Sequence, residues 1–257
     1  MLLTKLRRRS KTNRNQTLAT GIAMTDKGCV RKLNEDAVEL IFPGRREALS
    51  EKGVLAVLAD GMGGHQAGEV ASQMAVDIIK DVYYHHPDSP EKSLNRAFSE
   101  ANDKIFKMSQ ERDHCKGMGN TCSSIVLIDQ KLIFCHVGDS RIYRSQAGKF
   151  TQITEDHTLA AELDRAGREV HSQQHHILSR AMGIGTELDF QSGIIRRIKS
   201  ADRYLICSDG LYDLIDDEEL SELISIKTLF LSAQSMIALA KHRGGHDNIS
   251  VIILEIN

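Results

Sequence analysis

The sequence lacks the features that mark several classes of protein. It has no tryptophan, only three prolines in 257 residues, and no glycine/serine-rich linker or internal repeat. Nothing therefore marks a boundary between two large domains. No apolar run approaches the ~18 residues that cross a bilayer, and the basic start of the chain is not followed by an apolar signal segment. We expect a basic tail over residues 1–18 and one domain over residues 19–257, with no membrane span, as a monomer.

Cysteine usage excludes two further classes. The chain has five cysteines, an odd number, widely spaced and without a C-x-x-C pair. This pattern argues against a disulfide scaffold and against a structural zinc ribbon. A reducing, cytoplasmic location fits it best. Cys207 lies within an apolar run, so we interpret it as a small core residue rather than a nucleophile.

Charge is balanced overall but unevenly placed. The chain has 33 Lys and Arg against 35 Asp and Glu, a formal charge of -2, which gives no reason to expect a nucleic-acid coat protein. Six of the bases, and no acid, lie in the first 18 residues. A short solvated tail is the commoner outcome for such a segment, and binding to nucleic acid or anionic lipid is the alternative. We expect no nucleic-acid partner.

Hydrophobic periodicity predicts a mixed fold. Apolar residues at helical spacing predict helices within residues 71–82, 94–108 and 229–240. Short apolar or alternating runs predict strands at 54–59, 124–128, 132–137, 142–145, 204–207 and 251–256. Turn-like breaks at 129–130 and 138–140 separate consecutive strands, which favours antiparallel meanders covered by helices. The predicted class is α+β, in layers.

Acidic residues gather at the ends of these predicted strands. Three strands run into an aspartate beside a glycine, and further acids precede an early strand and the last one: Asp60, Asp139 and Asp209, then Glu35, Asp36 and Asp247. A single Asp-Gly pair is usually only a turn. Several carboxylates at one edge of a sheet would repel one another unless cations neutralised them, and Mg²⁺ or Mn²⁺ suits oxygen ligands better than Zn²⁺. Two such ions can activate a bridging water and clamp a phosphoryl group.

Seven motifs occur in an order that resembles a known family. They are Arg31-Lys-Leu-Asn-Glu35-Asp36, Asp60-Gly-Met-Gly-Gly-His65, Gly138-Asp-Ser-Arg141, Thr154-Glu-Asp-His157, Leu178-Ser-Arg-Ala-Met-Gly183, Cys207-Ser-Asp-Gly210 and Gly245-His-Asp-Asn-Ile249. The sequence is similar to the PP2C-like (PPM) metal-dependent protein serine/threonine phosphatases, in their bacterial form. The resemblance implies a four-layer α-β-β-α sandwich, with two antiparallel sheets flanked by helix pairs.

The resemblance also implies a role for each candidate residue. Asp60 would bridge two tightly bound Mn²⁺ or Mg²⁺ ions, and the Gly61 carbonyl would bind one of them. The other metal residues would be Asp209 and Asp247, with Glu35 and Asp36 in direct or indirect contact, and Asp139 at a weaker third ion. Arg31 would grip the substrate phosphate. A flap of about residues 156–183 would lie beside the cleft.

One position departs from the family pattern. Animal members place a histidine two residues after the bridging aspartate, where this chain has Met62. Thioether sulfur cannot donate a proton, whereas an imidazole titrates near ~6.5, so His65 is a candidate to protonate the leaving group together with metal-bound water. A purely structural role for His65, capping the glycine loop before the next helix, is the alternative.

The implied function is hydrolysis of phosphoserine and phosphothreonine in proteins by attack of a metal-bridging water. The implied partners are phosphorylated proteins and a Hanks-type kinase. The alternative is a catalytically weak phosphoprotein-binding regulator, which loss of a metal acid would mark. Two other interpretations are weaker. The glycine loop at 61–66 lacks the third glycine of a dinucleotide fingerprint, and His171, His175 and His176 lack a supporting zinc ligand and suit a polar flap tip.

Overall fold

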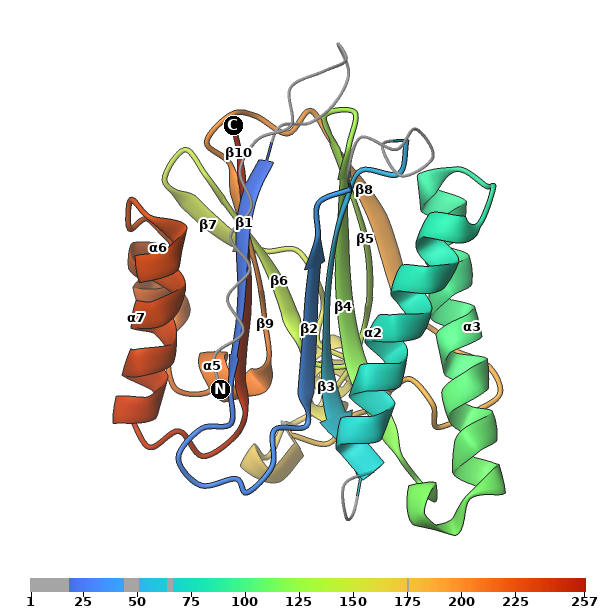
Figure 1. The fold of residues 1–257 in the computed structure, drawn as a ribbon. Coiled ribbons are helices and arrows are strands. Elements are labelled where there is room, and N and C mark those ends of the chain that lie inside the picture. The colour runs from blue at the N-terminus through green and yellow to red at the C-terminus, as the bar shows by residue number, and fades with distance from the viewer. Residues whose placement is uncertain (1–18, 44–50, 64–66, 175) are drawn as a thin grey trace.

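A computed structural model describes residues 19–43, 51–63, 67–174 and 176–257. Two five-stranded antiparallel sheets lie face to face, and helices cover the outer face of each (Figure 1). Helices α6 and α7 cover one sheet, and α2 and α3 cover the other. The predicted four-layer α+β sandwich is confirmed.

The strands follow a simple order in each sheet. The first sheet has the order β1-β10-β9-β6-β7, with bounds Ala19–Asp26, Ile249–Ile256, Arg203–Cys207, Arg141–Gln146 and Lys149–Gln152. The second has the order β2-β3-β4-β5-β8, with bounds Asp36–Ile41, Val54–Met62, Gly119–Ile128, Lys131–Val137 and Gln191–Arg196. The helices are α2 (Ala67–His85), α3 (Pro90–Glu111), α4 (Leu159–Arg165), α5 (Asp209–Tyr212), α6 (Asp217–Ile224) and α7 (Leu229–His242), with short 3₁₀ turns η1 (Asp113–Cys115) and η2 (Ser172–Gln174).

Strand β3 shows why the central strands are continuously apolar. Its even-numbered residues Val54, Ala56 and Leu58 pack in the core between the two sheets. Its odd-numbered residues Leu55 and Val57 pack in the core beneath α2 and α3. Because successive side chains of a strand point to opposite faces, a strand covered on both faces must be apolar throughout.

Local signals explain where two of the covering helices begin. Helix α3 starts at Pro90, where the missing amide hydrogen costs nothing, directly after the cap residue Ser89. Helix α6 starts with a capping box, in which the Asp216 carboxylate accepts from the Glu219 amide at 2.9 Å and Glu219 accepts from the Asp216 amide.

The structure confirms the three predicted helices, as α2, α3 and α7, and the six predicted strands, with their ends extended. One connection differs from the expectation. The 129–130 break is a hairpin between β4 and β5, but the 138–140 break carries the chain from β5 in one sheet to β6 in the other. Because the two strands do not pair, this break places Asp139 between the sheets.

Candidate metal centre

Two of the predicted acids lie on one sheet and face the other. Asp60 and Leu58 are two residues apart on β3, so their side chains point to the same face of the sheet, and Leu58 packs between the two sheets. Asp36 opens β2 and lies directly opposite Asp60 in the antiparallel register. Residues paired in this way have neighbouring side chains on one face, so the two carboxyl groups are close.

The second sheet supplies the other acids. Asp209 opens α5 directly after β9, and Asp247 lies just before β10. After burial, the charge of Asp209 helps to raise the pKa of both Asp36 and Asp60, so the two sets of acids lie close together. The sequence-based picture of carboxylates along the edge of a single sheet is therefore wrong. The acids come from both sheets, because the strand ends of a closed sandwich meet across the gap between its layers.

Asp36 is the most confined of these acids. It is 7% exposed, and its Oδ2 accepts a hydrogen bond from the Ser208 hydroxyl at 2.9 Å. Its Oδ1 is buried without a hydrogen-bond partner among the described residues. Burial raises the pKa of Asp36 to about 7, although hydrogen bonds from Ser250 and Ser208 favour its charged form. A buried carboxylate oxygen without a hydrogen-bond partner is well suited to bind a cation.

The neighbouring acids are perturbed in the same direction. Burial, and then the charge of Asp36, raises the pKa of Asp60 well above its ordinary value. Burial followed by the charge of Asp247 raises the pKa of Asp209 to about 6. Burial followed by the charge of Asp209 raises the pKa of Asp139, which is 6% exposed, to about 7. Without a cation, the protein opposes full ionisation of this cluster.

The backbone around Gly61 is packed too closely for a side chain. Its amide donates to the Glu35 carbonyl at 3.1 Å. A Cβ atom at this position would clash with the backbone of Gly68 and lie 2.6 Å from the same Glu35 carbonyl. Burial raises the pKa of the Glu35 carboxyl group. The glycine thus holds the ends of β2, β3 and α2 together and keeps Glu35 beside the cluster.

Arg31 lies at the rim of the site. Its side chain is 49% exposed, and its Nη2 donates to Asp247 Oδ2 at 2.6 Å. The loop that carries Arg31 is fixed by buried Asn248, whose Oδ1 accepts from the Glu35 amide at 2.8 Å and whose Nδ2 donates to the Leu33 carbonyl at 2.9 Å. Asn248 thus positions Arg31 and Glu35 together.

The structure adds Asp213, which the sequence did not single out, and brings His176 close to it. The ligand atoms of His176, Asp209 and Asp213 lie within 4.8 Å of one another. Asp213 lies four residues after Asp209, a spacing that was available in the sequence, but His176 comes from the flap region. His171 is exposed, and Ser172–Gln174 forms a short 3₁₀ turn rather than an α-helix. Both features agree with a polar flap tip.

Two of the sequence motifs contact each other at the base of the flap. Arg141, which follows Asp139, donates from Nε and Nη2 to the carboxylate of Asp156, at 3.0 Å and 2.6 Å. The Arg141 guanidinium also stacks 3.6 Å from the ring centre of Tyr212. This forked ion pair fixes the segment leading into the flap relative to the loop that carries Asp139.

The donor set fits hard divalent cations. It offers carboxylate and carbonyl oxygens, one of which, Asp36 Oδ1, is buried with no hydrogen-bond partner in the described part of the chain, and the raised pKa values of Asp36 and Asp60 indicate that nearby positive charge would favour their ionised forms. All five cysteines are free thiols, and Cys207 is buried in the core. His65 lies outside the described residues, as does the basic segment 1–18. No helix of the described chain is both long and apolar enough to span a bilayer.

Comparison with known proteins gives the family. The protein phosphatase 2C profile matches residues 32–241. The serine/threonine protein phosphatase PstP of Mycobacterium tuberculosis is 36% identical over 240 residues, which is 91% of this chain and 44% of that protein. This chain thus spans less than half the length of PstP. The serine/threonine phosphatase Stp of Listeria innocua is 32% identical over 244 residues, covering 91% of this chain and 94% of that protein.

Solved structures agree with this assignment. Stp1 of Staphylococcus aureus superposes with a TM-score of 0.86 at 28% identity, over 97% of this chain and 99% of that one. The PstP catalytic domain, solved in complex with two manganese ions, has a TM-score of 0.81 at 34% identity, over 93% of this chain and 98% of that one. The chain belongs to the protein phosphatase 2C family and carries a metal-dependent protein serine/threonine phosphatase domain of the bacterial type.

Proposed function

We propose that this protein removes phosphate from phosphoserine and phosphothreonine in other proteins, using Mn²⁺ or Mg²⁺ held by Glu35, Asp36, Asp60, Asp209 and Asp247. The observation that carries the proposal is the convergence of buried acids from both sheets, where Asp36 Oδ1 has no hydrogen-bond partner within the described chain. The Gly61 carbonyl is a further ligand. Asp139 serves a weaker third ion, next to Asp209, whose charge raises the Asp139 pKa.

The chain's own residues have distinct tasks in this reaction. When bound, the ions activate water as the nucleophile and offset the charge of the phosphate oxygens. Arg31, half-exposed at the rim, offers forked donors to the substrate phosphate, and its contact with Asp247 holds it next to the acids. We propose His65 as a donor of the proton that the departing serine or threonine oxygen takes up.

The proposed substrates are phosphoproteins made by a Hanks-type kinase, and the bacterial phosphatases that the chain resembles support this choice. We also propose that the protein acts as a monomer, and that it does so in the cytoplasm, whose reducing conditions suit the free thiols at all five cysteines. A phosphoprotein-binding regulator without activity would not need the metal acids, all of which are present. The acids therefore favour the enzyme.

The test is hydrolysis of a phosphothreonine peptide by wild type, Asp60→Asn and the matched control Asp103→Asn, which makes the same change at an exposed site on α3. We expect activity with Mn²⁺, none in EDTA, a loss of at least a hundredfold for Asp60→Asn and none for the control. Activity of metal-stripped protein in EDTA, or its loss on thiol alkylation while metal stays bound, would contradict the proposal.

The role of His65 needs a separate comparison. An alkoxide leaving group needs a proton, whereas the phenolate of p-nitrophenyl phosphate does not. His65→Ala should therefore lower turnover of the peptide and spare the phenyl ester. An equal loss on both substrates would assign His65 a structural role instead.

A further inference from the structure

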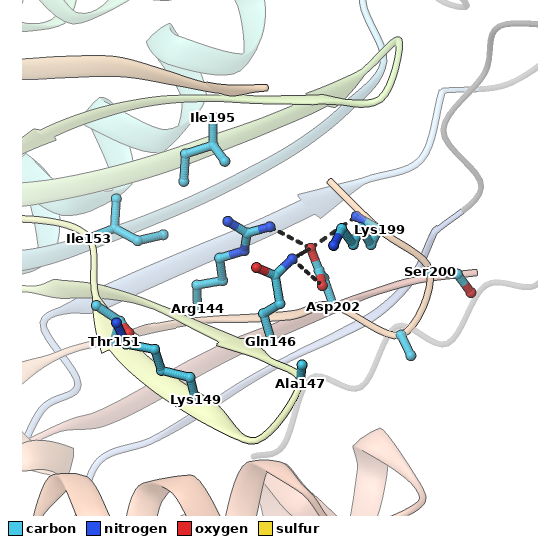
Figure 2. Close-up of a pocket in the computed structure, with 11 residues that line it drawn as sticks. Arg144, Gln146, Ala147, Lys149, Thr151, Ile153, Ile195, Lys199, Ser200 and Asp202 are labelled. Carbon is cyan, nitrogen blue, oxygen red and sulfur yellow. Dashed lines mark hydrogen bonds and ion pairs between the residues drawn. The ribbon is translucent and has the colours of Figure 1, made fainter. Parts of the chain in front are cut away.

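A cavity lies at the end of the sandwich opposite the metal centre. It has a volume of about 620 Å³ and opens between the β6–β7 hairpin and the connection from β8 to β9 (Figure 2). Strand β9 runs from Arg203 beside this cavity to Cys207 beside the metal acids. Five residues of strand span roughly 17 Å, so the cavity is a separate place on the molecule.

The cavity carries an excess of positive charge. Its charged lining residues are Arg144, Lys149, Lys199 and a single acid, Asp202. Asp202 is 2% exposed, and its carboxylate is already occupied by Arg144 Nη2 at 2.8 Å, Gln146 Nε2 at 2.9 Å and the Lys199 amide at 3.0 Å. It cannot also neutralise the ammonium groups of the two lysines, for which the described residues supply no ion pair.

Arg144 is a fixed donor in this site. Its ion pair with Asp202 holds the side chain, which is 21% exposed, and Figure 2 shows the guanidinium turned toward the Asp202 carboxylate, with Ile195 above it in the view. Its Nε is buried without a hydrogen-bond partner among the described residues. Because Nε is closed off from the cavity as well as from solvent, the guanidinium acts on a ligand through its positive charge and its fixed position.

The remaining lining decides the kind of acceptor. Ile153 and Ile195 form an apolar wall, and the hydroxyl groups of Thr151 and Ser200 lie at the rim. The guanidinium of Arg144 and the ammonium groups of Lys149 and Lys199, together with these hydroxyl groups, are the kinds of donor that bind phosphate oxygens. A volume of this size, with an apolar wall, takes a small organic molecule rather than a bare ion.

We propose that this cavity binds a small organic phosphate, with its phosphate group at Arg144, Lys149 and Lys199 and its apolar or aromatic body against Ile153 and Ile195. Arg196 and Arg197, both exposed in the adjoining connection, raise the local positive potential that draws such a ligand in. The site is independent of the phosphatase reaction, since none of its residues belongs to the metal centre.

The test measures binding of adenosine 5′-monophosphate by calorimetry in EDTA, which prevents metal-mediated binding of phosphate at the catalytic acids. Amide resonances of Gly148 and Ser200 report the place of binding. We expect saturable binding that shifts these resonances and weakens at least tenfold in the double variant Lys149→Ala/Lys199→Ala. Both lysines are exposed, so the variant should fold, and Thr151→Glu, which places a negative charge at the rim, should give the same loss.

The matched control is Lys92→Ala/Lys116→Ala, which removes two exposed lysines from outside the cavity and should bind as wild type does. Equal weakening in the control, or resonance shifts confined to residues around Asp60 and Asp209, would overturn the proposal. Inorganic phosphate is the second probe. If it binds as tightly as the nucleotide, the assignment to an organic phosphate is wrong, because the apolar wall would contribute nothing.

Discussion

Replacing Asp36 by asparagine should stabilise the metal-free protein while weakening its hold on metal. The wild-type carboxylate is buried and lies opposite Asp60, and one of its oxygens has no hydrogen-bond partner among the residues that the structure describes. Asparagine has nearly the same shape, removes the charge and keeps an oxygen to accept from the Ser208 hydroxyl. Asp36 therefore destabilises the folded protein when no cation is bound, although the same carboxylate is needed to bind cations.

The size of the effect follows from the pKa of Asp36, which burial raises from 3.8 to about 7. Such a change corresponds to about 4 kcal/mol of unfavourable free energy for the ionised group. Because the folded pKa is raised, stability is fully present below pH 4 and is lost as the pH rises through about 7. Relaxation of the neighbouring acids reduces the amount, so we expect Asp36→Asn to gain 2 to about 4 kcal/mol at pH 8.

The assay is urea unfolding in EDTA at pH 5 and pH 8, for wild type, Asp36→Asn and the exposed control Asp103→Asn. The gain of Asp36→Asn should be larger at pH 8 by about 2 kcal/mol, with an unchanged m-value, and the control should show neither effect. Saturating Mn²⁺ should reverse the order, because a ligand that binds only the folded state stabilises it in proportion to its affinity. A variant less stable than wild type in EDTA at pH 8, or a gain independent of pH, would refute the reasoning.

Three further predictions concern neighbouring groups. Arg31→Ala should lower kcat/KM for a phosphopeptide at least tenfold, while calorimetry should show that the Mn²⁺ affinity changes less than tenfold. The change in affinity is small because the exposed ion pair between Arg31 and Asp247 is worth about 0–1 kcal/mol. Loss of metal binding in this variant would contradict the assignment of Arg31 to the substrate phosphate. Asp139→Ala should keep its fold and two Mn²⁺ ions but need more Mn²⁺ for turnover, and unaltered turnover at every Mn²⁺ concentration would count against a third site. Burial lowers the pKa of His136 to about 3, so its imidazole stays neutral in the folded protein. In the unfolded chain the same imidazole takes up a proton below pH ~6.5. The free energy of unfolding should therefore fall by about 2 kcal/mol as the pH drops to 5. Urea unfolding of His136→Gln in EDTA should show a smaller loss over the same range, and an equal loss would show that another group is responsible.

The layered fold was predictable because its central strands are covered on both faces and its long helices carry apolar stripes. Two of the strands that the sequence did not reveal have little apolar pattern. Strand β7 (Lys149–Gln152) is four residues long and lies at a sheet edge, and β8 (Gln191–Arg196) has only two aliphatic residues. Their position comes from pairing with β6 and β5, which local periodicity does not encode.

The acids of the site were predictable because each lies beside a strand end or a glycine turn. The residues that hold these acids in place could not be predicted from the sequence. Ser208 reaches Asp36 across 172 positions of chain, and Asn248 holds the amide of Glu35 across 213. Contacts of this range exist only once both sheets have formed and packed, so an isolated Ser or Asn in the sequence carries no sign of them. The placement of His176 beside Asp213 has the same origin.

The origin of the acids in two sheets also ties metal binding to the packing of the sandwich. Asp36 and Asp60 are fixed on β2 and β3, whereas Asp209 and Asp247 are fixed beside β9 and β10, in the opposite layer. Neither sheet alone offers the complete set proposed above, so cations held by these acids would link the two layers as well as serve the reaction. Any change that shifts one sheet against the other must therefore alter metal affinity, even when it lies in the apolar core and touches no ligand.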